Sequence, residues 1–235
     1  MPDILALIPA RAGSKRVPGK NLRPFGGSNL TSIAIHQALS VKEISTVALT
    51  TDSDELLNLF SEVEGLELIK RPDALSDDKA PAMAYVKHSL ELLESKHQRK
   101  FDYVMILQPT SPLRTKEDIL GTIQLIERHP EADSAVTVMK VDHLNNPIKM
   151  KVLDGDKLIP FLEPEKGRLA ADQLPVLYVR NCAVYITRRE NIESITDVMG
   201  RRSVGYLMPA ERSVDINELF DFELAEFIYC KNESR

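Results

Sequence analysis

The first residues suited to chemistry lie in a basic, glycine-containing stretch between residues 10 and 21, which follows the apolar run at 4–8. Gly13 and Gly19 let the backbone approach an anion closely, an arginine can grip two phosphate oxygens, and a lysine supplies a point charge. The spacing fits neither a Walker A loop nor a dinucleotide fingerprint. The stretch predicts a phosphate-binding loop, with a solvated basic surface loop as the alternative. Its four cations are Arg11, Lys15, Arg16 and Lys20.

Carboxylates and an amide at two other places could act beside phosphates. Asp215 and Asn217 precede the last predicted helix and point to one side of an extended chain. Asp215 could hold Mg2+ against triphosphate oxygens, or this segment could form an Asx cap for the helix. Asp52 ends a predicted strand, where it could orient a lysine or arginine near phosphates or cap the next helix.

Two further segments carry candidate binding groups. Arg71 could stack on a base or hydrogen-bond to it, or it could be a surface arginine beside a turn. The apolar strand at 101–107 runs into a loop from Gln108 to Arg114 that contains two prolines. Proline stiffens a loop and removes backbone donors, so this loop has a fixed shape, for a site or for a rigid strand-to-helix connection.

Predicted strands and helices alternate through about residue 140. Apolar and β-branched runs predict strands at 4–8, 45–51, 66–69, 101–107 and 134–141. Helices are expected after Asn29, at 54–63, after Ser76, and from the capping box Thr115–Asp118. This alternation predicts an α/β fold with a mostly parallel sheet and helices on both faces. Ligands of such sheets bind beyond the carboxyl ends of the strands, where the candidate residues fall.

The rhythm changes at 142–178, where four prolines and weak helix signals predict short strands and loops. Strands at 183–186 and 203–207 and a helix carrying Phe220, Leu224 and Phe227 follow. We expect a single domain, 1–235, in which 142–178 is an inserted dimerisation segment. The segment is too irregular to bury its own apolar residues, so a partner would cover them.

Composition bounds the class of protein. A length of 235 residues fits one α/β domain with a full-sized core. The formal net charge of −5 argues against a general nucleic-acid binder. Cys182 and Cys230 lack metal-ligand spacing and indicate reduced thiols. No signal peptide is expected and no apolar run approaches the roughly 20 residues that cross a membrane, so we expect a cytoplasmic protein without a membrane partner.

As a whole, the basic stretch resembles the nucleotide-binding signature of the acylneuraminate cytidylyltransferase family, the CMP-sialic acid synthetases and related CMP-nonulosonate synthetases. The loop after residue 106 matches that family's Leu-Gln-Pro-Thr-Ser-Pro-Leu-Arg motif at every position. The resemblance covers nearly the whole chain and implies a Rossmann-like nucleotidyltransferase sheet. The first signature, approximately Pro-Ala-Arg-x-x-Ser-Lys, a spacer and Lys-Asn, is filled by Arg11, Ser14, Lys15, Lys20 and Asn21.

The resemblance also implies roles for individual residues. Catalytic work would fall to Arg11, Lys15, Lys20 and Asp215. The nucleotide would be bound by Ala10, Arg11, Gly13, Ser14, Lys20, Asn21, Arg71 and Asp52. The sugar would be bound by Gln108, Thr110, Ser111, Tyr178 and Asn181, and by Lys149 and Arg168 from the partner subunit. Mg2+ would be held by Asp215 and Asn217.

Three positions depart from the family pattern. The second aspartate of its Ser-x-Asp-x-Asp motif is Asn217, which can ligate through its carbonyl oxygen but brings no charge. The glycine that follows the family's asparagine is Cys182. The arginine before its glutamine-leucine-proline run is Ala171, and Arg168 or Arg180 could replace the lost guanidinium.

The activity implied by the resemblance is CTP-dependent transfer of CMP to the anomeric hydroxyl of a sialic-acid-like nonulosonic acid. Pyrophosphate would be released, Mg2+ would be the cofactor, and a cytoplasmic homodimer would serve cell-surface polysaccharide biosynthesis. One alternative is a nucleotidyltransferase for another acidic sugar, a phosphonate or a sugar phosphate. Another is a non-catalytic nucleotide-binding regulator, which Asn217 in place of aspartate would suit.

Overall fold

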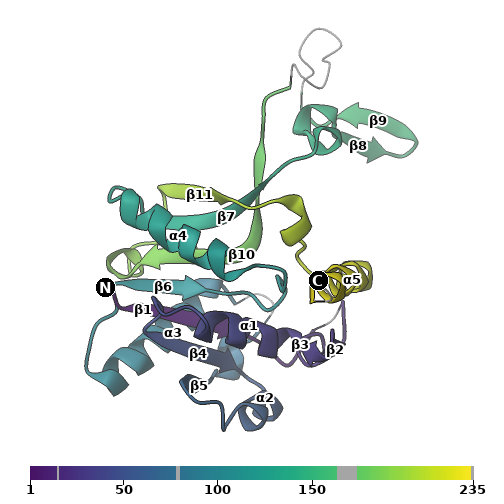
Figure 1. The fold of residues 1–235 in the computed structure, drawn as a ribbon. Helices are drawn as coiled ribbons and strands as arrows, with labels where there is room; N and C mark the ends of the chain where they lie inside the picture. The colour runs from purple at the N-terminus through teal and green to yellow at the C-terminus, as the bar shows by residue number, and fades with distance from the viewer. Residues whose placement is uncertain (15, 78–79, 163–173, 234–235) are drawn as a thin grey trace.

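The computed structural model describes residues 1–14, 16–77, 80–162 and 174–233. Its main sheet has seven strands: β1 (Ile4–Pro9), β4 (Thr46–Thr51), β5 (Leu66–Lys70), β6 (Tyr103–Ile106), β7 (Ser134–Lys140), β10 (Tyr178–Arg188) and β11 (Ser203–Leu207). Their order across the sheet is β11-β7-β10-β6-β1-β4-β5 (Figure 1). Every neighbouring pair is parallel except the two that involve β10. The predicted mostly parallel sheet is confirmed.

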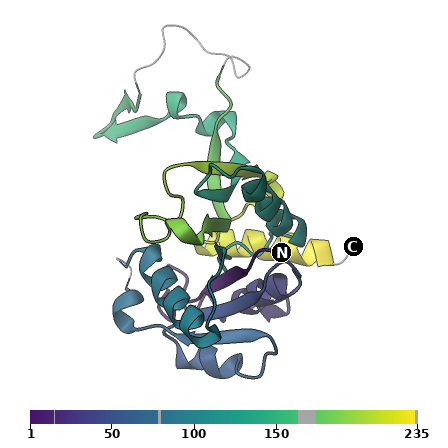
Figure 2. The same ribbon diagram turned by 90° about the vertical axis from the view of Figure 1, so that its left-hand side faces the viewer.

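Helices cover both faces of this sheet (Figures 1 and 2). They are α1 (Leu30–Leu39), α2 (Asp54–Leu59), α3 (Ala82–His97) and α4 (Lys116–Arg128). A further helix, α5 (Leu219–Glu233), instead packs through Phe222 and Ala225 against Phe25 and Leu30. Successive side chains of β1 point to opposite faces, so Ile4 and Ile8 pack with α1, α2 and α4, whereas Leu5 and Leu7 pack with α3. None of the described helices has the length and apolarity needed to span a bilayer.

The predicted helix starts are confirmed at two places. Asn29 accepts the backbone N–H of Ser32 at 2.8 Å and caps α1. Thr115 and Asp118 form the capping box of α4. These reciprocal bonds satisfy amide groups that have no partner within the helix.

Three elements differ from the prediction. The helix expected at 54–63 ends at Leu59, because the chain must turn through Gly65, at φ +78°, to begin β5. The strand expected at 183–186 is the longer β10, because it pairs with both β6 and β7. A small hairpin, β2 (Pro24–Phe25) and β3 (Ser28–Asn29), was not expected. Its signal is Gly26-Gly27, both at positive φ, as a two-residue hairpin turn requires.

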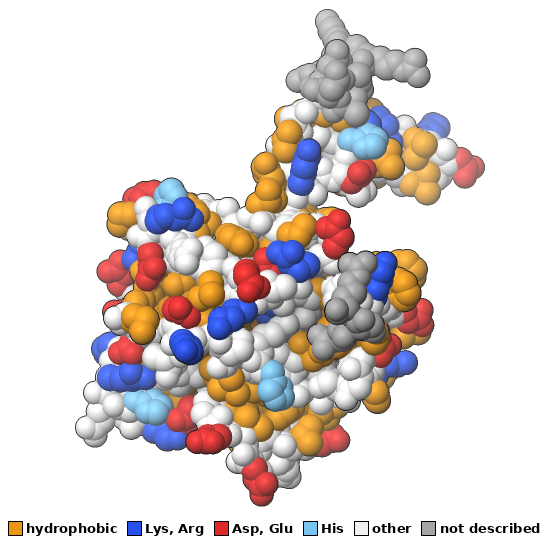
Figure 3. All heavy atoms as spheres, viewed as in Figure 1, with side chains coloured by type: hydrophobic (Ala, Val, Ile, Leu, Met, Phe, Trp, Pro, Cys, Tyr) orange, Lys and Arg blue, Asp and Glu red, His pale blue; other side chains and the backbone are white. Residues whose placement is uncertain are grey.

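The described part of the segment at 142–178 forms an arm that projects from the body of the molecule (Figures 1 and 2). Its described part contains a hairpin of β8 (Lys151–Asp154) and β9 (Lys157–Pro160), and residues 163–173 lie outside the description. Hydrophobic side chains gather on the arm surface (Figure 3). Those at least 43% exposed are Leu144, Met150, Val152, Leu153, Leu158, Ile159, Phe161, Leu162, Val176 and Tyr178.

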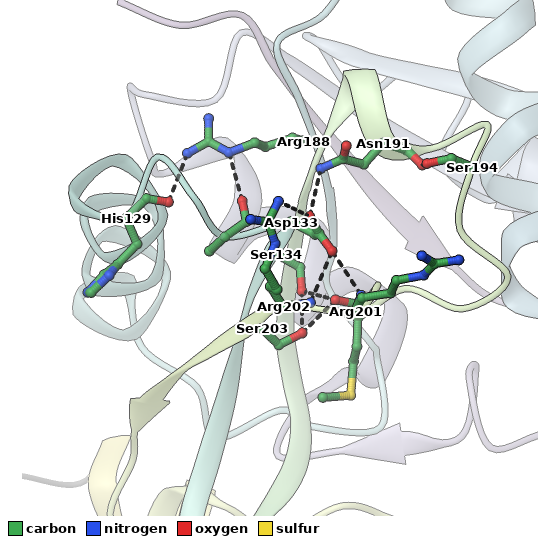
Figure 4. A network of polar contacts seen from close by, with 11 residues as sticks. His129, Asp133, Ser134, Arg188, Asn191, Ser194, Arg201, Arg202 and Ser203 are labelled. Carbon is green, nitrogen blue, oxygen red and sulfur yellow. Dashed lines mark hydrogen bonds and ion pairs between the residues drawn. The ribbon is translucent and has the colours of Figure 1, made fainter.

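A polar network fixes β7, β10 and β11 at the edge where β7 begins (Figure 4). Asp133 accepts the backbone N–H groups of Arg201 at 2.8 Å and Arg202 at 3.0 Å, and these bonds lower the pKa of its carboxyl. Asn191 Nδ2 donates to the same carboxylate at 3.3 Å. Arg188 donates to carbonyls at the carboxyl end of α4. This network anchors the antiparallel half of the sheet at the edge opposite the carboxyl ends of β1, β4 and β6.

Candidate active site

The basic loop leaves the carboxyl end of β1 and is pinned at several points. Asp52, which follows β4, accepts the backbone N–H of Ala12 at 2.8 Å through Oδ1. Asn21 Nδ2 donates to the Arg11 carbonyl at 2.9 Å and closes the loop across its base. Gly19 has φ +65°, a conformation that few other residues adopt at low cost. The loop backbone is therefore fixed at the sheet edge where ligands bind.

A cavity of about 300 Å³ lies at this edge. Its walls come from the basic loop, the segments that follow β5 and β6, and the start of α3. Among its described lining residues, three cations face one carboxylate, Asp77, which suits an anionic ligand. The predicted site residues that line it are Arg11, Ser14, Lys20, Asn21, Arg71, Gln108 and Thr110.

Arg71 is the most deeply buried cation of the cavity, with 4% of its surface exposed. Its Nη2 donates to the Thr50 carbonyl at 2.8 Å, and its guanidinium carbon lies 4.5 Å from the centre of the Tyr85 ring. Burial lowers the pKa of Arg71 and raises that of Tyr85 to about 12. The surface-arginine alternative is wrong. Tyr85, which also lines the cavity, was not anticipated, because its spacing is that of an ordinary core residue of α3.

Lys20 joins the basic loop to the segment before α5. Its Nζ donates to the Ile216 carbonyl at 2.8 Å. Burial lowers the pKa of Lys20, and the nearby Asp215 carboxylate opposes that shift. Asn217 Nδ2 donates to Asp215 Oδ2 at 2.9 Å, and Asn217 Oδ1 accepts from Arg16 Nη2 at 2.9 Å. The structure thus brings Asp215 beside Lys20 and engages both ends of the Asn217 amide.

The loop between Gln108 and Arg114 is held from within by a buried cation. Arg114 Nη1 donates to the carbonyls of Gln108 at 2.6 Å and Ala183 at 3.0 Å, and burial lowers the pKa of Arg114 to about 9. Gln37 Nε2 donates to the carbonyls of Pro112 and Arg114, each at 2.8 Å. The guanidinium therefore ties the cavity wall that carries Gln108 to β10.

Comparisons with known proteins identify the family of this chain. A family model described as cytidylyltransferase matches residues 5–199, most of the chain. The chain belongs to the cytidylyltransferase family.

This cytidylyltransferase resembles curated proteins along nearly its whole length. It is 30% identical over 234 residues to the CMP-N,N'-diacetyllegionaminic acid synthase of Legionella pneumophila, covering 98% of this chain and 97% of that protein. It is 28% identical over 229 residues to the pseudaminic acid cytidylyltransferase of Campylobacter jejuni, covering 97% of each. It is 30% identical to the N-acylneuraminate cytidylyltransferase of Escherichia coli, but spans 52% of that protein, about half its length.

Solved structures share the fold. A CMP:2-keto-3-deoxy-manno-octonic acid synthetase complexed with CTP superposes with a TM-score of 0.71 at 18% identity, covering 98% of this chain and 99% of that one. A 4-diphosphocytidyl-2C-methyl-D-erythritol synthase gives a TM-score of 0.69 at 11% identity, covering 97% and 100%. The expected nucleotidyltransferase sheet is confirmed.

Several predicted site residues of this cytidylyltransferase hold the segments that form the site. Asn181 is 4% exposed and donates from Nδ2 to Ser213 Oγ at 2.8 Å, and Ser111 is 1% exposed. Their side chains are turned into the protein and are not among the described residues that line the cavity, and their sugar contacts stay predictions. Asp52 holds the loop and does not cap α2, because Ser53 accepts the N–H of Leu56.

Other predicted residues are not among the described lining residues of the cavity, or lie outside the described residues. Ala10 is fully buried beside the loop, and the space around Gly13 is open. Lys149 and Tyr178 lie on the arm and at its base, and Tyr178 is 55% exposed. The predicted site residues outside the described residues are Lys15 and Arg168.

Cys182 adopts a backbone conformation that favours glycine. Its φ is +63°, at the irregularity in the pairing of β10 with β7. Its Sγ accepts from Tyr185 Oη at 3.2 Å, and burial raises the pKa of the Cys182 thiol. The position where the resemblance places a glycine thus keeps the glycine conformation with a side chain present.

We expect Cys182→Gly to be more stable than Cys182→Ala by about 1 kcal/mol, because the left-handed conformation penalises any Cβ. The two replacements both remove the thiol, so their difference isolates the backbone. At an ordinary position alanine is the more stable of the two. Urea unfolding of the two variants measures this difference, and a more stable alanine variant would contradict backbone strain at this residue.

Proposed function

We propose that this chain transfers CMP from CTP to the anomeric hydroxyl of a nonulosonic acid and releases pyrophosphate. The observation that carries the proposal is the single cavity in which Arg11, Lys20, Arg71 and Gln108 meet. The names of the relatives, which specify N-acylneuraminate, pseudaminic acid and legionaminic acid, support an acidic nine-carbon sugar as acceptor. A neighbour with the same fold binds CTP.

In this proposal the nucleotide spans the cavity from the basic loop to Arg71. Arg11 and Lys20 donate to the triphosphate, with Arg11 able to bind two oxygens at once. Arg71 is held by Thr50 and stacks on a neutral tyrosine, so its guanidinium presents a fixed edge to the cytosine. Asn21, which closes the loop, lies beside the ribose.

The reaction is an in-line displacement at the α-phosphorus. The anomeric oxygen bonds to that phosphorus while the bond to the α–β bridging oxygen breaks. Pyrophosphate leaves with the electron pair, and the hydroxyl proton passes to solvent. The protein contributes by positioning the reactants and by offsetting the charge that develops on the leaving group.

Mg2+ fits the donors that the site offers. The ion prefers oxygen ligands and keeps several waters, so one carboxylate with triphosphate oxygens suffices. We assign that carboxylate to Asp215, beside Lys20, and propose that Asn217 orients it and makes a weaker contact with the ion. No group of three or more histidine, cysteine or acidic side chains suited to a metal occurs among the described residues. In this proposal the triphosphate and water supply the other ligands of the ion. When bound, Mg2+ would offset charge on the leaving pyrophosphate.

Pyrophosphate release with four nucleotides and several acceptors tests the proposed function. We expect turnover with CTP and with at least one nonulosonic acid, and little with UTP, GTP or ATP. Turnover only with a sugar phosphate or a phosphonate would favour another nucleotidyltransferase. CTP binding without pyrophosphate release from any acceptor would favour a non-catalytic regulator.

We also propose a homodimer, working in the cytoplasm, whose product would be a donor for cell-surface polysaccharide. The arm supports the dimer, because an isolated two-stranded hairpin is marginally stable in water. In its register Val152 lies opposite Ile159 on one face, and Leu153 lies opposite Leu158 on the other, and all four are exposed. A second chain would cover these faces and bring its Lys149 toward the cavity.

Mixing two inactive variants tests whether sites are shared. We expect Lys20→Ala and Lys149→Ala chains to be weak alone, and their mixture to recover up to about a quarter of wild-type activity. Random pairing makes about half of the dimers mixed. In a mixed dimer, one of the two composite sites has both lysines and the other has neither. Light scattering must show dimers at the assay concentration, and no recovery despite subunit exchange would contradict a composite site.

A further inference from the structure

Arg180 is a cation near the site, and the proposed reaction assigns no role to it. It lies in β10 with an exposed side chain, and its Nη1 donates to Met199 Sδ at 3.4 Å. A thioether is a weak acceptor, and no carboxylate of the described residues forms an ion pair with Arg180. The guanidinium therefore keeps donors for an anionic ligand.

The backbone register turns Arg180 toward the α3 side of the sheet. Arg180 lies opposite Val138 in the pairing of β10 with β7, and Val138 packs against the core cluster beneath α3. Residues directly opposite in an antiparallel pair share a face. Tyr178, two residues earlier, shares it as well. The cavity is lined on this same side, by Ala82 and Tyr85 of α3.

Neighbouring groups connect Arg180 to the acceptor end of the cavity. Asn181, the residue after Arg180, donates from Nδ2 to Ser213 Oγ at 2.8 Å, and its carbonyl accepts from Ser111 Oγ at 3.5 Å. Lys20, which lines the cavity, donates from Nζ to the Ile216 carbonyl at 2.8 Å. The turn at 181–183 is held against the wall that carries Gln108. The segment 213–216 thus contacts both Lys20, on the phosphate side of the cavity, and the turn that follows Arg180.

We propose that Arg180 binds the carboxylate of the acceptor, from the same chain that supplies Gln108. This assignment rests on the proposed function, because a nonulosonic acid is what brings a carboxylate into the site. In a 2-keto sugar acid the carboxylate is bonded to the anomeric carbon, so a bidentate guanidinium would orient the attacking hydroxyl.

Kinetics with the preferred nonulosonic acid and its C1 methyl ester test the proposal. We expect Arg180→Ala to raise KM for the acid roughly tenfold to a hundredfold and to leave KM for CTP unchanged. The ester cannot pair with a guanidinium as an anion, so its kinetics should change little and the preference for acid over ester should collapse. Arg180→Lys should restore part of that preference. Arg128→Ala, an exposed arginine at the end of α4, is the matched control and should match wild type.

The outcomes separate this assignment from the proposed function. An unchanged KM for the acid, or equal losses for acid and ester, overturns the role of Arg180 while CTP-dependent turnover by wild type stands. A parallel loss of CTP affinity shows a structural role and also overturns it. If wild type turns over no nonulosonic acid, the proposed function fails and the assignment fails with it.

Discussion

The Lys20→Ala enzyme should lose roughly tenfold to a hundredfold in kcat/KM for CTP, the cost of one charge-assisted hydrogen bond in the transition state. Lys20 lines the cavity, and its Nζ already donates to the Ile216 carbonyl, which directs the ammonium toward the segment that holds Asp215. Removing it takes away a positive charge where the triphosphate accumulates negative charge. Initial rates of pyrophosphate release at varied CTP measure the effect.

Lys42→Ala is the matched control, because Lys42 is exposed in the turn after α1. It should leave kcat/KM unchanged, and both variants should retain the wild-type circular dichroism spectrum. Full activity of Lys20→Ala would show that the triphosphate binds elsewhere. A loss that is matched by Lys42→Ala would indicate a general effect of net charge.

Activity should collapse in Asp215→Asn, even at high Mg2+. Asp215 is the only carboxylate that the segment 215–217 offers, and the substitution keeps its shape while removing its charge. The Asn217 and Lys20 neighbours stay in place, so the change isolates the charge. A Mg2+ titration of the initial rate measures the loss, and an unaltered rate and metal dependence would mean that the ion is held elsewhere.

Asn217→Asp provides the reciprocal test. In wild type, Asn217 Nδ2 donates to Asp215 Oδ2, so an aspartate would place two carboxylates against each other. We expect lower thermal stability without metal, a recovery on adding Mg2+ and a tighter apparent Mg2+ affinity in the rate. A stability that Mg2+ does not change would mean that residue 217 does not reach the ion and serves only to orient its neighbours.

The fold was largely predictable because local sequence signals mark boundaries of helices and strands that the structure also has. The apolar run at 4–8, the cap at Asn29 and the capping box at Thr115 each name a boundary by its chemistry, and each lies where the structure has it. The hairpin at Gly26-Gly27 was missed although its turn residues are a direct signal. Its strands are two residues each, too short for a hydrophobic pattern.

The site was predictable where backbone position decides the role and less so where side-chain direction does. The sheet edge collects the basic loop, Arg71 and Gln108 whatever the detail of packing. Asn181 and Ser111 belong to the same segments, but their side chains point inward, which depends on the irregularity in β10 and on loop geometry.

The buried supports of the site leave no trace in the sequence. Arg114 reads as the last residue of a motif, yet it is a buried cation whose partners are carbonyls far apart in the chain. Tyr85 has the spacing of a core residue and becomes a cavity residue because Arg71 stacks on it. Such roles follow from contacts between distant segments, which periodicity and spacing do not encode.

CMP transfer to the acceptor is tested most directly by following the anomeric oxygen of the acceptor. A nonulosonic acid labelled with oxygen-18 at the anomeric hydroxyl is incubated with CTP, Mg2+ and the enzyme, and the nucleotide product is analysed by mass spectrometry. We expect one CMP-sugar per pyrophosphate, with the label retained between the sugar and the phosphorus. A product without the label, or release of inorganic phosphate and CDP in place of pyrophosphate, would contradict CMP transfer to that hydroxyl.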